Sequence, residues 1–204
     1  MRRPAVRRAV AVALAATALG LLAEATWIPA KAVLAQVLLR SAWQRARSGE
    51  AAPRPWPWAD TWPVARLTVP GRGIELYVLA GASGRNLAFG PAHVDGTARP
   101  GAVGNCALAG HRDTSFAFLR DLAPGDELVL ETPDGRRRRY RVREAGVFDR
   151  SDTWLLAPQP VAGPERLLTL VTCYPFDAVV PGGPGRYVVR AVAERGPDGL
   201  DRAS

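Results

Sequence analysis

Residues 167–177 read LLTLVTCYPFD, an apolar run that ends on Cys173 and continues into an aromatic residue and a proline. A short, continuous apolar run bounded by turn residues is typical of a strand that is buried on both faces. We therefore expect a strand at 167–173 with the cysteine at its end. Nothing within ten residues resembles a base that could activate the thiol, so any partner must come from a distant part of the sequence.

The surrounding sequence predicts a mostly β domain. Short strands are expected at 64–69, 74–79, 105–110, 127–131 and from 186 to 194, and the turn PDG joins ELVLE to a basic strand in a hairpin. Only TSFAFLRDL (114–122) is expected to be helical. The pattern is that of a barrel or sandwich, and the absence of a βαβ rhythm argues against a parallel nucleotide-binding sheet.

Two other polar residues are expected at strand ends. His111 follows NCALAG (105–110), and Arg186 opens RYVVRAVAE after a loop rich in glycine and proline. If the strands at 105–110 and 167–173 are parallel neighbours, their carboxyl ends bring His111 and Cys173 to one edge of the sheet. An antiparallel return strand would begin at that same edge, and it begins with Arg186.

Such a trio is suited to nucleophilic chemistry at a cysteine. A free thiol has a pKa of about 8.5, and nearby cationic groups lower this pKa and favour the thiolate. An imidazolium can act as general acid for a leaving amine, and a guanidinium offers forked donors to a carbonyl or a developing oxyanion. From spacing alone, an inert buried thiol and a hydrogen-bonded structural histidine remain the alternatives.

Three motifs in this order resemble those of the sortase family. TLVTC (169–173) resembles the sortase signature TLxTC, and AGHR (109–112), preceded by PGAVGN, resembles the sortase histidine region. Arg186, thirteen residues after the cysteine, matches the family arginine. The resemblance covers residues 64–194. The stretches WIPAKA, RPWPWADTWPVARL, NLAFGPAHV and CYPFDAVVPGGPGRYVV most resemble the proteobacterial class GN sortases.

The resemblance implies an all-β fold, a closed sortase-type barrel of about eight strands with short helices, preceded by an N-terminal transmembrane helix. It also implies cysteine transpeptidase activity on a secreted protein with a C-terminal sorting signal. Cys173 would attack a backbone carbonyl of that signal, and an amine acceptor would resolve the thioester. His111 would be the general acid/base, Arg186 the substrate and oxyanion stabiliser, and Thr172 a substrate-side contact. No cofactor is implied, and no acidic cluster in the sequence argues for a metal site.

His93 and Cys106 compete for the same roles and are assigned structural ones. His93 is expected in a loop, in a segment (FGPAHVDGT) that matches a non-catalytic part of the family. Cys106 precedes His111 by five residues, about 16 Å along an extended strand, so it lies too far from Cys173 for a disulfide if Cys173 meets His111. We expect a buried free thiol at Cys106. Two cysteines and two histidines also argue against a disulfide framework and a His-rich metal cluster.

The first thirty residues are expected to be a membrane anchor. The arginine-rich MRRPAVRRAV leads into a stretch from Ala9 to Ala30 in which only Glu24 is charged, long enough for one span of about 20 residues. A cleaved secretory signal is the alternative, but the stretch exceeds a signal's apolar core, and Trp27 and Lys31 follow as interfacial markers. The dense N-terminal arginines favour a cytoplasmic N-terminus. This predicts a single-pass protein of the inner (cytoplasmic) membrane whose catalytic domain faces the extracytoplasmic or periplasmic side.

Four segments follow from these patterns: an anchor (1–30), a juxtamembrane helix and Pro/Trp linker (31–62), a catalytic barrel (63–195) and a flexible tail (196–204). The juxtamembrane helix is expected to leave the membrane with one wet face, from the helical spacing of Val33, Leu34, Val37 and Leu38. A helix buried in the domain is the alternative. The linker tryptophans are expected on the domain surface or near the bilayer interface.

The positive charge belongs to the N-terminal appendage. The whole chain of 204 residues carries +8, but residues 1–55 account for +7 and the remaining 149 residues for +1. The charge therefore does not indicate nucleic-acid binding. The basic run at 136–139 is expected to form the solvated face of its hairpin.

A membrane-tethered transpeptidase is the leading hypothesis, and two others are kept. One is a cysteine peptidase in which water resolves the thioester, which the sequence cannot separate from transfer to an amine. The other is a non-catalytic anchored binding module, and the presence of all three polar residues argues against it. The Ser-His-Gly-Cys-type motif of cysteine transpeptidases that act on peptidoglycan is absent from the sequence.

Overall fold

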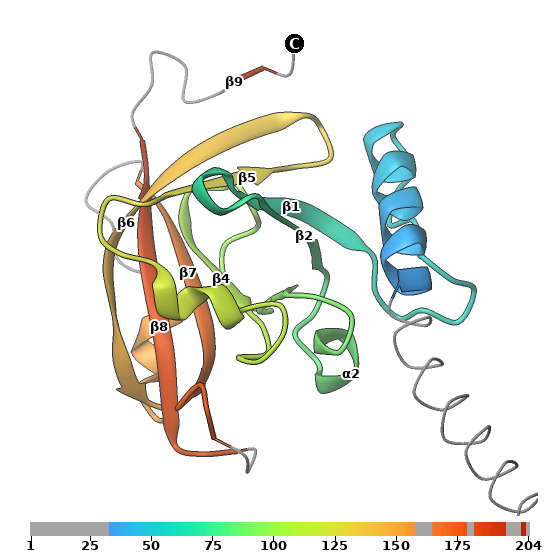
Figure 1. The fold of residues 1–204 in the computed structure, drawn as a ribbon. Helices are drawn as coiled ribbons and strands as arrows, with labels where there is room; N and C mark the ends of the chain where they lie inside the picture. Colours follow the sequence, from blue (N-terminus) through green and yellow to red (C-terminus); the bar gives the residue numbers. More distant parts are fainter. Residues whose placement is uncertain (1–32, 158–164, 179–181, 195–200, 203–204) are drawn as a thin grey trace, which may run out of the picture. The chain divides into compact units, whose positions relative to one another are not determined.

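The computed structural model describes residues 33–157, 165–178, 182–194 and 201–202 (Figure 1). The expected anchor at 1–30 lies outside these ranges. The chain divides into two compact units, 1–38 and 39–204, and the second contains the β domain. Within the described ranges, no helix combines the length and the apolar character that crossing a bilayer requires.

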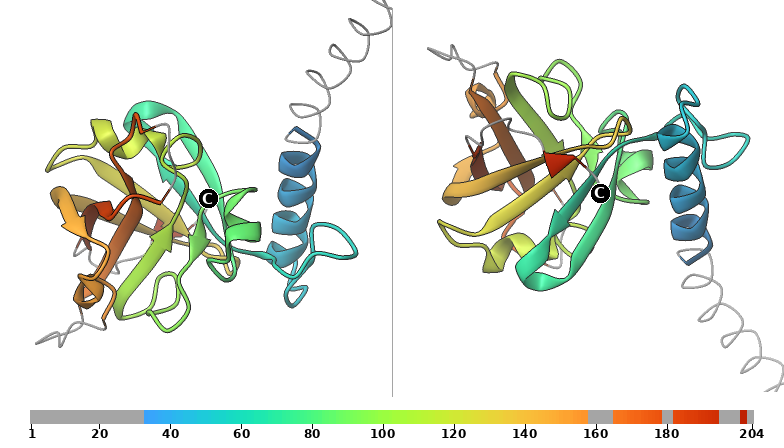
Figure 2. Two further views of the ribbon diagram at one scale, coloured as in Figure 1. Left: turned by 90° about the horizontal axis from the view of Figure 1, so that it is seen from below. Right: turned by 90° about the horizontal axis from the view of Figure 1, so that it is seen from above.

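The β domain is a ring of strands (Figures 1 and 2). The strands are β1 (Pro63–Val69), β2 (Ile74–Leu79), β3 (Ala92–His93), β4 (Gly104–Ala109), β5 (Glu127–Glu131), β6 (Arg136–Asp149), β7 (Arg166–Tyr174), β8 (Gly185–Ala193) and β9 (Asp201–Arg202). Their order is β5-β1-β2-β3-β4-β7-β8-β6-β9, and the additional pairing of β5 with β6 closes β1–β8 into a barrel. The expected closed barrel of about eight strands is confirmed.

The pairing directions give the barrel two chemically different rims. All strand pairs are antiparallel except β2–β3 and β4–β7. Strands β1, β4, β6 and β7 therefore end at one rim, where β2, β3, β5 and β8 begin. We call this rim the Cys173 rim, because β7 reaches it at Cys173. We call the opposite rim, which includes the loop between β3 and β4, the Arg99 rim.

The core of the barrel follows from the alternation of side chains along the strands. On β7, Leu168 and Leu170 face the interior and are 0% exposed, together with Leu108 of β4 and Val189 of β8. Apolar burial of this kind is the main favourable term in folding. Buried side chains thus hold β4, β7 and β8 in place, and the residues at the ends of these strands have defined positions.

Short helices connect the strands. They are η1 (Pro70–Arg72), α2 (Gly84–Leu87), η2 (Ala117–Asp121) and η3 (Thr153–Leu155). The helix expected at 114–122 is a single 3-10 segment, η2, which buries Phe118 and Leu119. His93, expected in a loop, instead ends the two-residue strand β3 and pairs with Leu108. The sequence-based placement of His93 was wrong in this respect, because a strand of two residues leaves no periodic pattern.

A longer helix, 33–47, precedes the linker. Its expected helical character is confirmed, but from Leu39 onward it matches the alternative of a helix buried in the domain. Leu39 and Trp43 are at most 1% exposed and belong to a cluster with Tyr77, Leu79 and Ala92. In the linker that follows, Trp56 packs edge-on against Phe89 with ring centroids 4.7 Å apart, whereas Trp58 is 81% exposed.

Candidate active site

Cys173 and Arg186 are directly opposite each other on neighbouring strands. They are register partners in the antiparallel pair β7–β8, an arrangement that places Cβ atoms about 5 Å apart. Because Leu168 and Leu170 point into the barrel, the alternation along β7 places Cys173 on the outer face. The thiol is half-buried there, and so is the Arg186 side chain.

His111 follows the strand on the other side of β7. Strands β4 and β7 are parallel with Ala109 opposite Val171, and the Gly110 amide donates to the Val171 carbonyl at 3.2 Å. His111 therefore follows the end of β4 at the level of Cys173, the last residue but one of β7, and it is exposed. The expected parallel pair and the antiparallel return strand are both confirmed, so the three residues lie at one rim.

Thr172, whose side chain faces the barrel interior, helps to hold the end of β4 beside β7. It is 2% exposed, and its hydroxyl donates to the Gly110 carbonyl at 2.7 Å. Because successive residues of a strand face opposite sides, Thr172 points away from the face that bears Cys173. The geometry thus gives Thr172 a positioning role, and the substrate-side contact that we expected for it stays a prediction.

The turn that carries His111 requires a glycine. A Cβ on Gly110 would lie 2.7 Å from the ring of Phe116, closer than real carbon contacts allow. This close approach lets Phe116, which is 0% exposed, enter the core just below the turn. The Phe116 amide also donates to the His111 carbonyl at 2.9 Å. Core packing therefore holds the backbone of the histidine.

The Arg186 guanidinium is only partly engaged by the protein. Its Nη1 donates to the carbonyls of Gly183 and Gly185 at 2.9 and 2.8 Å. Its Nε and Nη2 groups make no hydrogen bond to any residue in the described part of the chain. An arginine has five N–H donors, so the backbone contacts orient the group and leave three donors for an oxyanion. The pKa of Asp149, at the end of β6, is lowered by hydrogen bonds from the Ser151 hydroxyl and amide and then by the charges of Arg150 and Arg186.

An aromatic cluster borders the cysteine, and we did not foresee it from the sequence. Tyr174 stacks on Tyr187 with an interplanar angle of 24°, and Phe176 meets Tyr187 edge-on with centroids 5.1 Å apart. The Arg120 guanidinium from η2 lies 4.8 Å from the centroid of Phe176. The aromatic residue after Cys173 was the available signal, since a large ring beside a strand end needs a packing partner.

Arg112 is a second residue that our sequence reasoning missed. It is 9% exposed, directly follows His111, and donates through Nη2 to the Ala178 carbonyl at 2.6 Å. It therefore ties the turn of the histidine to the loop that follows the cysteine. A charged residue next to a candidate catalytic histidine was visible in the motif AGHR, but its burial was not.

The competing cysteine and histidine lie elsewhere. Cys106 is 1% exposed on the inner face of β4, and burial raises the pKa of its thiol to about 12. Both cysteines are free, as expected. His93 belongs to the Arg99 rim, where its Nε2 lies 2.9 Å from the Ala98 carbonyl oxygen and 3.1 Å from Thr97 Oγ1. Within the described ranges, no three acidic, histidine or cysteine side chains gather to hold a metal ion.

Comparison with known proteins agrees with this architecture. The sequence model of the Sortase domain matches residues 67–194. Sortase D of Bacillus subtilis (strain 168) is 32% identical over 123 residues, which are 60% of this chain and 60% of that protein. The chain thus matches about three fifths of that relative's length.

Two solved structures share the fold. A Clostridium perfringens sortase D5 transpeptidase aligns with a TM-score of 0.57 and 28% identity, over 66% of this chain and 80% of that one. Sortase E1 from Streptomyces coelicolor with a tripeptide in its active site aligns with a TM-score of 0.55 and 29% identity, over 65% and 88%. The subclass within the family stays a prediction. The closed barrel and a family match over more than half of the chain lead to one conclusion: this chain belongs to the sortase family.

Proposed function

We propose that this protein is a cysteine transpeptidase that cleaves a peptide bond in the C-terminal sorting signal of a secreted protein and transfers the acyl group to an amine. The observation that carries the proposal is the cross-strand pair of Cys173 and Arg186, at the rim where His111 follows the parallel strand β4. Membership of the sortase family supports it, as does a similar structure described as a transpeptidase.

In the first half-reaction, the Cys173 thiolate attacks the scissile carbonyl and forms a carbon–sulfur bond. The carbonyl electron pair moves to oxygen, and the free Nε and Nη2 donors of Arg186 stabilise this oxyanion. When the oxyanion collapses, the carbon–nitrogen bond breaks and His111, as imidazolium, gives its proton to the leaving amine. The product is a thioester on Cys173 and a neutral imidazole.

In the second half-reaction, an amine enters where the first amine left. Neutral His111 accepts a proton from the attacking nitrogen, a new carbon–nitrogen bond forms, and the carbon–sulfur bond breaks. The thiolate and the imidazolium are thereby restored together. Water in place of the amine would give hydrolysis by the same steps, so the acceptor distinguishes the transpeptidase from the peptidase.

The fold supports this chemistry by limiting motion at the rim. The nucleophile lies one residue before the end of a strand whose inner residues are buried, and hydrogen bonds from Gly110 and Thr172 hold the histidine turn to that strand. Such preorganisation reduces the free energy needed to bring the reacting groups into alignment. We propose that Arg112 extends it to the loop after Cys173 through the Ala178 carbonyl.

The proposal is tested by acyl transfer with the full chain. The protein is incubated with a library of peptides from the C-termini of secreted proteins of the same genome and with an isotope-labelled amine, and the labelled amide is measured by mass spectrometry. The wild type is expected to form the amide, Cys173→Ala to form none, and Arg186→Ala to lose about 100-fold or more in rate. Cys106→Ala is the matched control and should retain activity. Wild-type protein that forms neither amide nor hydrolysed peptide would favour a non-catalytic binding module.

We also propose that residues 1–30 anchor the protein in the inner membrane as a single span, with the barrel on the extracytoplasmic side. The support is the sequence pattern of arginines followed by an apolar stretch. Protease treatment of spheroplasts tests it, with a cytoplasmic protein as the control. The barrel should be digested in intact spheroplasts, and protection until lysis would contradict this topology.

A further inference from the structure

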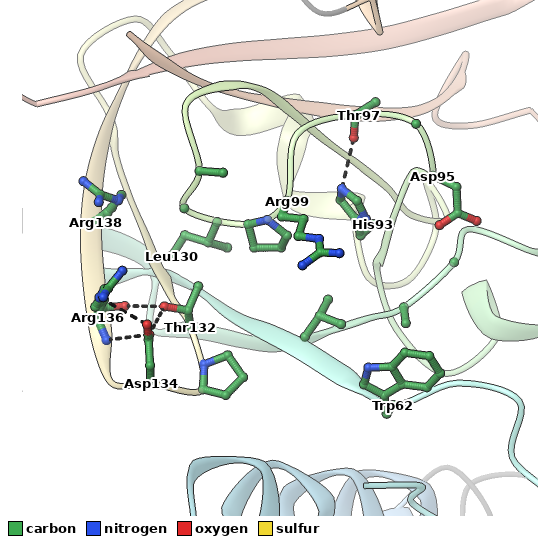
Figure 3. Close-up of a pocket in the computed structure, with 18 residues that line it drawn as sticks. Trp62, His93, Asp95, Thr97, Arg99, Leu130, Thr132, Asp134, Arg136 and Arg138 are labelled. Atoms are coloured by element: carbon green, nitrogen blue, oxygen red, sulfur yellow. Dashed lines mark hydrogen bonds and ion pairs between the residues drawn. The ribbon is translucent and has the colours of Figure 1, made fainter. Parts of the chain in front are cut away.

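A cavity of about 1010 Å³ opens at the Arg99 rim, far from the candidate active site along the strands (Figure 3). Its walls come from the start of β1, the end of β2, β3 and the following loop, and the β5–β6 turn. On β4 and β7, by contrast, His111 and Cys173 follow or occupy the opposite ends. Its volume is at the upper end of the range of small-molecule sites, about 300–1,000 Å³. The cavity is thus a separate space with room for an organic ligand.

Three arginines line this cavity, and they differ in the charged groups that surround them. Arg136 is paired with Asp134, whose carboxylate lies 3.1 Å from its Nε. The pKa of Arg138 is lowered by burial and then by the charge of Arg166, against the charge of Asp134. The two arginines on the β6 side of the cavity are therefore both engaged by charged neighbours.

Arg99, in the loop after β3, provides the third positive charge. Its backbone carbonyl accepts from the Ala102 amide at 2.9 Å, but its guanidinium makes no hydrogen bond or ion pair with any residue in the described part of the chain. Figure 3 shows its guanidinium reaching into the space enclosed by the lining, beside His93 and away from the Arg136–Asp134 pair. An arginine presents five donors in a planar fork. Arg99 is thus a cation whose donors are all available to a ligand.

Two other polar side chains of the lining, Thr97 and His93, are hydrogen-bonded within the protein. The Thr97 hydroxyl donates to the Val94 carbonyl at 2.7 Å and accepts from the Ala107 amide at 3.2 Å. His93 Nε2 lies at hydrogen-bond distance from the Ala98 carbonyl. These bonds fix the loop that carries Arg99. Recognition in the cavity is therefore left mainly to guanidinium groups.

One carboxylate opposes the positive charge. Asp95 is exposed and lines the cavity, but Figure 3 shows it on the far side of His93 from Arg99. The apolar walls include Trp62 and Val64, both half-buried, which can cover the carbon atoms of a ligand. The lining thus combines the Arg99 guanidinium with apolar walls that include an aromatic ring.

We propose that this cavity binds a phosphate group carried on a small organic moiety, with Arg99 as the anchor. Arginine matches the geometry of phosphate oxygens with paired N–H donors. The volume exceeds what a free ion needs, and the wall that includes Trp62 and Val64 suits the attached carbon skeleton. A soluble phosphate ester and the phosphate headgroup of a membrane lipid share this chemistry.

Binding is measured by titration calorimetry on the full chain, with glycerol 3-phosphate as the probe and glycerol as the uncharged control. Arg99→Gln is expected to weaken binding about tenfold, the effect of losing one hydrogen bond to a charged group. The matched control is Arg143→Gln, another exposed arginine, which lies on β6 outside the cavity lining. This control should bind as the wild type does. Both variants should retain the acyl-transfer activity of the wild type, which separates this test from that of the proposed function.

A second arm distinguishes the two sources of phosphate. The full chain, held in detergent micelles, is titrated with a short-chain phosphatidylglycerol, and glycerol 3-phosphate is added as a competitor. A headgroup ligand predicts weaker binding of this lipid to Arg99→Gln than to Arg143→Gln, and displacement of the lipid from the wild type by the competitor. A soluble ester predicts the calorimetric result with equal lipid binding by the two variants. Each result supports a phosphate site and names its source.

Three outcomes would overturn the proposal. The first is the absence of saturable binding of glycerol 3-phosphate to the wild type. The second is equal weakening by Arg99→Gln and Arg143→Gln, which would show unspecific attraction to a basic protein. The third is a preference for acidic peptides over the phosphate ester in the same titration.

Discussion

The two rims of the barrel contain similar residue types and put them to different uses. At the Cys173 rim, a cysteine and an arginine face each other on adjacent strands and a histidine follows the neighbouring strand. At the Arg99 rim, the histidine is bound to the backbone of its own loop and the arginines line a cavity. Residue type alone therefore does not mark the reactive end. What marks it is the convergence of a thiol with cationic groups whose donors are not all used by the protein.

The two cysteines give the largest expected contrast. Cys106 faces the core, and burial raises the pKa of its thiol to about 12, so only about one molecule in ten thousand carries the thiolate there at pH 8. Iodoacetamide at that pH should therefore alkylate Cys173 at least about 1,000-fold faster than Cys106. Peptide mapping by mass spectrometry measures both rates, and unfolding in urea should equalise them. Comparable rates in the folded protein would remove the distinction between the two sites.

The two histidines test the rims directly. His111→Ala should lower the rate of acyl transfer by about 100- to 10,000-fold, because proton transfer to the leaving amine is lost. His93→Ala should leave most of the activity and instead lower the midpoint of thermal unfolding, since His93 holds the loop after β3. Activity assays and calorimetry on both variants check this pair. A large loss of activity in His93→Ala with an unchanged fold would indicate that the general acid lies at the Arg99 rim and would contradict its assignment to His111.

Glu131, at the end of β5, tests the stability of the Arg99 rim. It is 2% exposed and pairs with Arg66, with Arg137 at 3.0 Å and with Arg47 at 3.7 Å. Burial alone would raise the pKa of Glu131, but the hydrogen bonds and charges of Arg66 and Arg137 outweigh it and lower the pKa. At pH 7, Glu131→Gln should cost about 1.5–3 kcal/mol of unfolding free energy, the range for hydrogen bonds to charged groups.

The pH dependence of this effect has a defined sign. Because the folded-state pKa is lowered, the carboxylate stabilises the fold above the unfolded-state pKa of about 4.3, and the stabilisation is lost as pH falls through the folded-state value. The difference between wild type and Glu131→Gln in urea denaturation should thus be largest near neutral pH and shrink in acid. A difference that grows in acid would contradict the assignment.

Two buried threonines of β7 provide the smallest expected effect. Thr172→Val removes the hydrogen bond to Gly110 and should lower kcat about tenfold at most, with KM little changed, because the histidine turn shifts relative to Cys173. Thr169, whose hydroxyl donates to Asn105 Oδ1 at 2.7 Å, is the matched control. Thr169→Val should lower stability and leave kcat near the wild-type value. Equal kcat in the two variants would argue against a positioning role for Thr172.

The strands around Cys173 could be predicted because burial on both faces leaves a continuous apolar signal. The same logic placed His111 and Arg186 at strand ends. The sequence suggested that β4 and β7 could be parallel neighbours, and the structure adds their pairing and its register. Thr172, Arg112 and the stack of Tyr174 on Tyr187 were different. Their roles depend on which side chains meet after the barrel has closed, and no local period in the sequence encodes such contacts. The cavity at the Arg99 rim went unforeseen for the same reason, because segments from 62 to 138 in the chain form its walls.

The central claim is that Cys173 is the residue that carries the acyl group. The most direct measurement is to quench the full chain in acid during turnover of a reactive peptide, digest it and locate the acyl adduct by tandem mass spectrometry. The account predicts an adduct on Cys173 that hydroxylamine removes, as it does a thioester, and that accumulates when the amine acceptor is omitted. An adduct on Cys106, or turnover of the peptide with no acyl-enzyme and undiminished activity in Cys173→Ala, would contradict it.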